Sequence, residues 1–359
     1  MKGYVVLESG EVFEGNLFGD GMDVHGEIVF YTGMTGYQGV ISDPTMKGKI
    51  VVFTYPLVGN CGINESGFES ANSHVGGIII SEVAEEGFHY ESNSTLLSYC
   101  QKVSLPVLSG IDTRAIVKRI RKHGEMRAIL TTDPKKVDFD HFSPIGMQDV
   151  VPLVSESMIQ TYGSGDHHIV MVDFGYRKSI LEMLLKQGCK VTIVPHSTSY
   201  AEIKQLLPSG VLFTNGPGNP MQLKEQLNEM KKVAENFPTL GIGLGHQLLA
   251  LAFGAKTEKL SFGHRGPNQP VIDKQTNKVY MTSQNHNYIV KEETLAGTGF
   301  EPRFININDQ SIEGLSHTKY PVFTTQFHSV ASPGPSDSEQ LFLTFIETLK
   351  NKGREKVYA

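Results

Sequence analysis

Residues 238–252 read PTLGIGLGHQLLALA, and this stretch decides the fold of the second half of the chain. The apolar run 239–242 predicts a buried strand, and residues 244–252 predict a buried helix. Gly241, Gly243 and Gly245 lie where the predicted strand meets the predicted helix. Glycine allows two elements to approach closely and tolerates a strained central residue, so the segment predicts a nucleophile elbow. The first N–H groups of the helix would then face the substrate and hold a developing oxyanion.

Strand and helix patterns alternate on both sides of this segment. The predicted strands are 169–173, 191–194, 210–214 and 239–242, and the predicted helices are 179–187, 201–207, 222–236 and 337–350. Such alternation is typical of βαβ crossovers. We therefore expect an α/β domain over residues 151–359, with a mostly parallel sheet that helices cover on both faces.

The first part of the chain has a different pattern. Short β-prone runs at 4–7, 27–31 and 50–55 are separated by glycine-rich turns, and one helix is expected at 113–122 with Asp112 as its N-cap. Periodicity weakens over residues 143–166. We expect a strand-rich α/β domain over residues 1–150, with the domain boundary in this weak region.

Composition narrows the class of protein. The 359 residues have a net charge of -6, 39% hydrophobic residues and three widely separated cysteines. This profile favours a globular cytoplasmic protein without a general nucleic-acid or membrane surface. The basic run at 118–123 is interpreted as a solvated helix end. The histidines and cysteines show no metal-binding spacing, so no metal site is expected.

The elbow segment resembles the sequence GICLGHQLLALA of class I, triad-type glutamine amidotransferases, and most closely that of the carbamoyl phosphate synthetase small-subunit family. Further matching blocks are TGMTGYQG at 32–39, TYPLVGN at 54–60, NGPG at 215–218, FGHRG at 262–266 and SQNH at 283–286. The blocks follow the family's order along almost the whole chain. Two domains are implied, an N-terminal domain particular to this family and a class I amidotransferase domain.

The resemblance also exposes missing catalytic groups. The family's cysteine nucleophile corresponds to Gly243, its histidine to His328, and its orienting glutamate to Val330. A thiolate must attack the glutamine carboxamide while the histidine moves the proton. Because glycine offers no side chain, we expect the glutaminase activity to be lost. Rescue by Cys61 or Cys189 is disfavoured, since neither is expected near His328.

Residues that would contact glutamine are carried over from the family position by position. They are Thr45, Gly216, Gly218, Leu244, Gln247, Asn285, Asn287 and Tyr288. Thr45 replaces the usual serine, and Asn287 stands where glycine is common. The main-chain N–H groups of Gly218 and Leu244 would form the oxyanion hole. Because those groups do not depend on the lost side chains, glutamine binding could survive.

Three functions remain open. The chain could be a small subunit that docks on the carbamoyl phosphate synthetase large subunit, which would bind ATP and magnesium, and that leaves the synthetase dependent on free ammonia. It could instead be a glutamine-binding regulatory subunit of an ammonia-dependent synthetase, or a glutaminase that works by another route. No cofactor is expected in this chain itself. An arginine-specific and a pyrimidine-specific role are both compatible with the sequence.

Overall fold

The chain divides into two compact units. The computed structural model describes residues 1–21, 23–140, 147–330 and 334–357. Unit 1 comprises Met1–Gln148 and Ser261–Gly266, and unit 2 comprises Asp149–Leu260 and Pro267–Ala359. Residues 143–146, where the weak region begins in the sequence, lie outside the described residues. The return of residues 261–266 to unit 1 has no counterpart in the sequence pattern.

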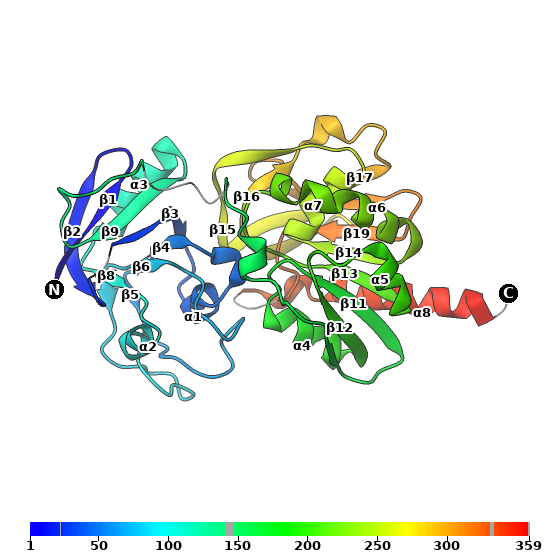
Figure 1. Ribbon diagram of the computed structural model, residues 1–359, viewed down its shortest axis with the longest axis horizontal. Coiled ribbons are helices and arrows are strands. Elements are labelled where there is room, and N and C mark those ends of the chain that lie inside the picture. The colour runs from blue at the N-terminus through cyan, green and yellow to red at the C-terminus, as the bar shows by residue number, and fades with distance from the viewer. Residues whose placement is uncertain (22, 141–146, 331–333, 358–359) are drawn as a thin grey trace. The chain divides into compact units, whose positions relative to one another are not determined.

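Unit 1 is built around a closed barrel, with strand order β1-β2-β8-β6-β4-β3-β9 among the described residues (Figure 1). The barrel strands are β1 (Lys2–Leu7), β2 (Val12–Phe18), β3 (Val24–Tyr31), β4 (Lys49–Phe53), β6 (Gly77–Ile79), β8 (Val107–Ser109) and β9 (Met126–Thr131). β5 (Leu57–Val58) and β7 (Glu82–Val83) pair separately. The helices are α1 (Tyr37–Ile41), η1 (Pro44–Met46), α2 (Leu96–Lys102) and α3 (Thr113–His123). The strand-rich character is as predicted, whereas closure of the sheet was not foreseen.

Helix α3 shows how local sequence sets an element of unit 1. The Asp112 side chain accepts a hydrogen bond from the Ala115 N–H at 2.9 Å, which confirms the predicted N-cap. Ile116 and Ile120, four residues apart, are fully buried. The basic residues of the last turn are exposed, so the basic run is the solvated helix end that the sequence indicated.

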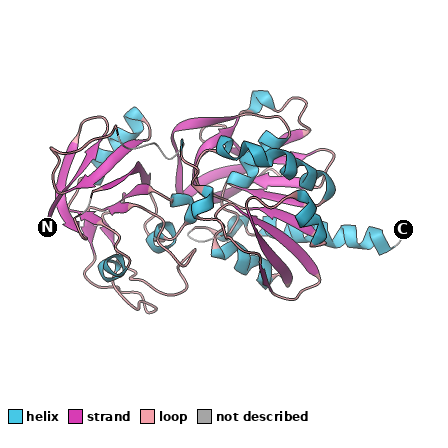
Figure 2. Ribbon diagram, in the orientation of Figure 1, coloured by secondary structure: helices cyan, strands magenta, loops and turns pink. Residues whose placement is uncertain are grey.

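Unit 2 contains a ten-stranded sheet with the order β10-β12-β11-β13-β14-β19-β18-β16-β15-β17 among the described residues (Figure 2). The strands are β10 (Gln160–Tyr162), β11 (His167–Asp173), β12 (Cys189–Pro195), β13 (Gly210–Phe213), β14 (Thr239–Ile242), β15 (Thr257–Asp273), β16 (Lys278–Val290), β17 (Phe300–Asn306), β18 (Ile312–His317) and β19 (Val322–Thr325). The helices are α4 (Lys178–Lys186), α5 (Tyr200–Gln205), α6 (Leu227–Asn236), α7 (Leu244–Ala252) and α8 (Gln340–Val357), with shorter η3 (Val151–Leu153), η4 (Pro220–Gln226), η5 (Glu292–Thr294) and η6 (Ser336–Ser338).

The sheet of unit 2 is parallel in one part and antiparallel in the rest, so the expectation of a mostly parallel sheet is wrong. The pairs β12–β11, β11–β13, β13–β14 and β14–β19 are parallel. The pairs β10–β12, β18–β19, β16–β18, β17–β18 and β15–β17 are antiparallel. Short turns join β15 to β16 and β17 to β18, and a short turn can connect only antiparallel strands, whereas parallel strands need a crossover. The parallel part therefore ends where the crossover helices end.

The parallel strands are buried on both faces, as expected. Along β11, Val170 and Val172 belong to one hydrophobic cluster, and Ile169 and Met171 belong to another. The helix expected at 222–236 is divided into η4 and α6, and Leu223 inside η4 takes non-helical angles (φ -103°, ψ 22°).

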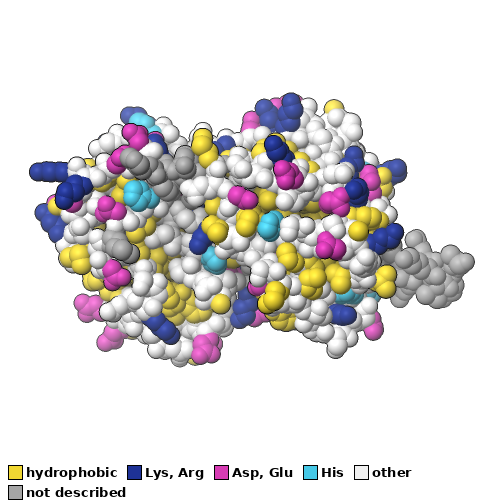
Figure 3. All heavy atoms as spheres, viewed as in Figure 1, with side chains coloured by type: hydrophobic (Ala, Val, Ile, Leu, Met, Phe, Trp, Pro, Cys, Tyr) yellow, Lys and Arg dark blue, Asp and Glu magenta, His cyan; other side chains and the backbone are white. Residues whose placement is uncertain are grey.

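The surface and the cysteines complete the description. On the face drawn in Figure 3, basic and acidic side chains are interspersed. Among the described residues, the helices are too short or too polar to cross a bilayer. Cys61, Cys100 and Cys189 form no disulfide among the described residues, and Cys189 begins β12 and is buried.

Candidate functional site

Gly243 lies at the sharp turn between β14 and α7, as the sequence predicts. It is the N-cap of α7, with φ 57° and ψ -108°. Its N–H donates to the Thr325 carbonyl at 2.8 Å, and the N–H of Gly245 donates to the Thr214 carbonyl at 3.0 Å. Both neighbours of Leu244 are thus tied to adjacent strand ends. The turn has the construction of a nucleophile elbow and no side chain at its tip.

The flanking glycines are required by close packing. A Cβ atom on Gly241 would lie 2.6 Å from Leu249 Cδ1, and one on Gly245 would lie 2.3 Å from the Phe213 carbonyl oxygen. Both distances are shorter than real Cβ atoms show. This explains the glycines on either side of Gly243 by sterics alone.

His328 follows β19 and is held beside β16. Its N–H donates to the Ser283 carbonyl at 2.9 Å, and the two residues form an isolated antiparallel bridge. The side chain is buried, and within the described residues its Nδ1 atom has no hydrogen-bond partner. Burial lowers the pKa of His328 well below its ordinary value, and the positive charges of Arg177 and His286 lower it further. The imidazole is therefore neutral at physiological pH.

Val330 occupies the expected carboxylate position but belongs to the hydrophobic core. It is 7% exposed and packs in a cluster with Ile169, Met171, Ile180 and Phe323. Residues 331–333, the next part of the motif, lie outside the described residues. A valine cannot orient an imidazole by hydrogen bonding. An aliphatic contact has thus replaced the polar one expected from the family pattern.

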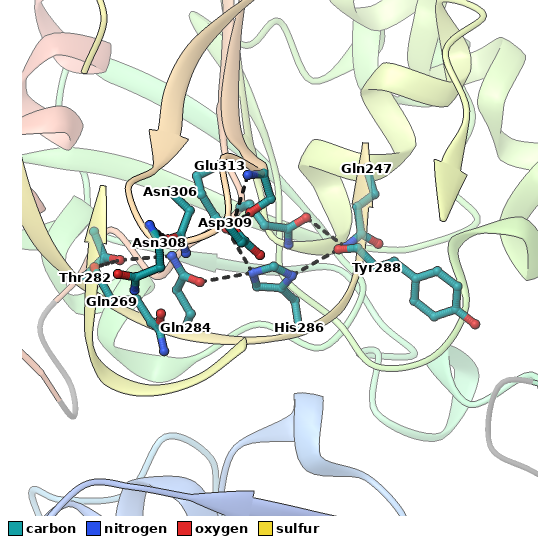
Figure 4. Close-up of polar contacts among 12 residues, drawn as sticks. Gln247, Gln269, Thr282, Gln284, His286, Tyr288, Asn306, Asn308, Asp309 and Glu313 are labelled. Atoms are coloured by element: carbon teal, nitrogen blue, oxygen red, sulfur yellow. Dashed lines mark hydrogen bonds and ion pairs between the residues drawn. The ribbon is translucent and has the colours of Figure 1, made fainter. Parts of the chain in front are cut away.

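Gln247 joins α7 to the segment that contains the predicted substrate residues. Its Nε2 donates to the Tyr288 carbonyl at 3.0 Å and to Gln326 Oε1 at 2.9 Å. Asn285, Asn287 and Tyr288 lie on β16, and all three are partly buried. The structure therefore brings Gln247 and Tyr288 together through the backbone of Tyr288 (Figure 4).

The remaining predicted substrate residues lie in three places, namely a loop, helix α7 and η1 of unit 1. Gly216 and Gly218 lie in the loop after β13; Gly218 has φ 92°, and a Cβ on Gly216 would lie 2.4 Å from the Phe174 carbonyl oxygen. Leu244 is buried at the first helical position of α7. Thr45 lies in η1 of unit 1, where its N–H donates to Asp43 Oδ1 at 2.9 Å. Its membership of the glutamine site stays a prediction.

The neighbouring histidines have structural contacts. His246 is fully buried, and its Nδ1 contacts Thr324 Oγ1 at 2.7 Å, which is a structural hydrogen bond. Burial lowers its pKa to about 3. His264 lies on the part of β15 that belongs to unit 1. His286 lies on β16 in a buried polar network.

Three further residues of this region were not assigned a role from the sequence. Asn215 is buried behind the elbow, and its Nδ2 donates to the Gly175 carbonyl at 3.0 Å. Arg177 is 1% exposed at the N-cap of α4, and its charge acts on His328. Glu313 is fully buried on β18. A charged residue inside an apolar run, as in 312–315, is the available sequence signal for Glu313.

Chemically, the elbow retains the backbone features of an acyl-transfer site. A main-chain oxyanion hole can form without side chains, and a neutral histidine lies in the same unit. Covalent catalysis is excluded at position 243, since glycine supplies no nucleophilic atom. The elbow has no side-chain group that could form a thioester.

Two known families match different parts of the chain. The family "Glutamine amidotransferase class-I" matches residues 170–348. The family "Carbamoyl-phosphate synthase small chain, CPSase domain" matches residues 5–130. The first match includes the elbow and β16, and the second includes the whole barrel except the ends of β1 and β9.

Similar proteins match over their full lengths. The carbamoyl phosphate synthase arginine-specific small chain of Halalkalibacterium halodurans is 54% identical over 359 residues, which is 100% of both chains. The arginine-specific small chain of Bacillus subtilis is 46% identical, again over 100% of both chains. The carbamoyl phosphate synthase small chain of Bacillus cereus is 42% identical over 99% of both chains.

Proposed function

Because the chain belongs to the carbamoyl-phosphate synthase small chain family, we propose that it is the amidotransferase-type subunit of a carbamoyl phosphate synthetase and that it does not hydrolyse glutamine. In this role it docks on a large subunit in the cytoplasm, and the large subunit uses ATP and magnesium. The names of its relatives at 54% and 46% identity support an arginine-specific enzyme.

The observation that carries the loss of hydrolysis is the bare elbow at Gly243. Removing the nucleophile of a catalytic triad lowers kcat by on the order of 10⁶. The position where the family has the triad glutamate holds Val330, which has no carboxylate and packs in the core. Within the described residues, His328 Nδ1 has no partner that would fix its tautomer. The assembled synthetase would therefore draw its nitrogen from free ammonia.

The decisive experiment uses the chain purified with its cognate large subunit. Carbamoyl phosphate formation is measured with glutamine and, separately, with ammonium as the nitrogen source. Synthesis from ammonium alone supports the proposal. Release of glutamate far above the uncatalysed rate overturns it.

A regulatory role is the second candidate, and the Gln247–Tyr288 contact favours it. The substrate-side strand is held to the elbow helix by a hydrogen bond within the chain itself, so a binding surface can persist without chemistry. In the same assay, this role predicts that glutamine changes the ammonium-driven rate without being consumed. A rate that is independent of glutamine would exclude it.

A further inference from the structure

His286 has hydrogen-bond acceptors at both of its ring nitrogens. Its Nδ1 lies 3.0 Å from the Tyr288 carbonyl oxygen. Its Nε2 lies 3.2 Å from Gln284 Oε1 and 3.4 Å from Glu313 Oε1. Figure 4 shows the ring between these three groups. A carbonyl oxygen or a carboxylate cannot donate, so each nitrogen must itself carry a proton to be satisfied.

The orientation of Gln284 is set by its other neighbour. Thr282 Oγ1 donates its single proton to the Gln269 carbonyl at 2.8 Å. Thr282 Oγ1 can then only accept from Gln284, whose Nε2 lies 3.2 Å away. The amide oxygen of Gln284 is consequently the atom that faces His286. Reversing the amide would place two acceptors against each other at Thr282.

We propose that His286 is held as a doubly protonated imidazolium by the carboxylate of Glu313, and that Glu313 is a positioning residue for the glutamine site. The two side chains are 4% and 0% exposed, respectively. A buried charge is costly unless it is paired and hydrogen-bonded, and this pair satisfies both conditions. Ser311 Oγ lies 3.3 Å from the same carboxylate oxygen but only 2.7 Å from Asp309 Oδ1, which is the nearer acceptor for its single proton.

The pair connects the β17–β18 hairpin to the elbow helix. His286 and Gln247 both donate to the Tyr288 carbonyl, from Nδ1 and Nε2. The Gln326 N–H donates to the Glu313 carbonyl at 2.8 Å, while the Gln326 side chain accepts from Gln247. Glu313 therefore acts on Tyr288 through His286. The further effect of Tyr288 on bound glutamine rests on the proposed function, because it requires that this chain binds glutamine.

The surrounding histidines respond to the same charge. Burial lowers the pKa values of His246 and His328; the Glu313 carboxylate raises that of His246, and a positive charge on His286 would lower both. One imidazolium and two neutral imidazoles are the expected set in this region. The three rings can be distinguished by the number of protons on each.

The test uses the full chain labelled with 15N-histidine. Two-dimensional NMR at neutral pH reports how many ring nitrogens of each histidine carry protons, and the His286 signals are assigned by their absence in His286→Gln. Two protonated nitrogens are expected for His286. One unprotonated ring nitrogen in the wild-type protein would overturn the charge assignment, and this measurement requires neither glutamine nor a large subunit.

Glu313→Gln then tests the positioning role, with Glu301→Gln on the exposed end of β17 as the matched control. Glu313→Gln keeps the size and removes the charge, so His286 should lose one ring proton. Glutamine affinity, measured by calorimetry, should fall about tenfold, which corresponds to ~1.4 kcal/mol, about the free energy by which a charge-assisted hydrogen bond exceeds a neutral one. Glu301→Gln should change neither.

Each result is decisive. Unchanged affinity in Glu313→Gln, together with the lost proton, would overturn the positioning role and leave the charge pair intact. Wild-type protein that binds no glutamine would overturn the positioning role together with the proposed function, while the NMR result would still decide the charge. If Glu313→Gln does not fold, the wild-type spectrum decides the charge, and His286→Gln, which removes the ring that joins Glu313 to Tyr288, replaces it in the affinity measurement.

Discussion

A Cβ atom on Gly243 would lie 3.1 Å from the Cβ atom of Asn215. This is tighter than most real Cβ contacts, and Gly243 also has a positive φ of 57°. The elbow therefore disfavours any side chain on two independent grounds, space and backbone conformation. A side chain at this position is tolerated only at an energetic cost, which glycine avoids.

Replacing Gly243 with alanine should destabilise unit 2 by about 1–2 kcal/mol, from the positive φ and the Asn215 contact together. The measurement is the shift of the thermal unfolding transition. Gly254→Ala is the matched control, since Gly254 has φ 103° with nothing within 4 Å of its would-be Cβ. The difference between the variants reports the Asn215 contact. A Gly243→Ala protein as stable as wild type would contradict the strain argument.

Reintroducing the nucleophile should restore part of the glutaminase activity. Gly243→Cys supplies a thiol, and His328 is in the same unit to move the proton. The double variant Gly243→Cys, Val330→Glu should release glutamate faster than the single variant, because a carboxylate orients the imidazole. Gly243→Ser is the control for the thiol. Equal rates in the single and double variants would show that the carboxylate has no role here.

Loss of the Gln247 amide should weaken glutamine binding and leave the fold intact. Gln247→Leu removes the hydrogen bonds to Tyr288 and Gln326 and strands their oxygen atoms in a buried site. We expect roughly tenfold weaker binding by calorimetry, since a buried unpaired acceptor costs about 1–3 kcal/mol. The exposed Gln205→Leu on α5 serves as the control. Identical affinities of the two variants would remove Gln247 from the site.

Acid should destabilise unit 2 through His246. Burial lowers the pKa of His246 to about 3, whereas the unfolded chain keeps a value near 6.5. Below about pH 6.5 the unfolded chain binds a proton that the folded chain does not, so stability falls as the pH decreases towards 3. The slope should be about 1.4 kcal/mol per pH unit for this one group.

The corresponding measurement is the unfolding free energy at pH 7, 6 and 5, for wild type and for His246→Gln. The variant should show a shallower loss, because it removes the titrating group while it retains an amide opposite Thr324. Parallel pH profiles for the two proteins would rule out His246 as the source.

The parallel half of unit 2 could be predicted from local sequence because each element carries its own pattern. The strand at Thr239–Ile242 and the turn at Gly243 follow from an apolar run and three glycines. The antiparallel extension and the closed barrel could not be predicted this way. Both depend on which distant strands pair, such as β1 with β9, and periodicity within one strand contains no information about its partner.

The candidate site also has features that the sequence predicts and features that depend on tertiary contacts. The resemblance predicts Gly243, His328 and Val330 as the triad positions, and that assignment stays a prediction; the burial of Val330 among aliphatic residues could not be predicted. Gln326 and Glu313 had no assigned role because their significance lies in contacts with Gln247 and His286, which are distant in sequence. Hydrogen-bond partners of this kind are set by tertiary packing.

Because Val330 is packed in the core, a glutamate at position 330 would be harder to restore than a cysteine at position 243. A thiol at position 243 would add two heavy atoms at a buried turn, where Asn215 is the residue within 3.4 Å of the added Cβ. A glutamate at position 330 would have to enter a cluster that Ile180 and Phe323 help to fill, so neighbouring side chains would need to change with it. If the chain has lost glutamine hydrolysis as proposed, an evolutionary return to glutamine use would require several coordinated substitutions in the interior.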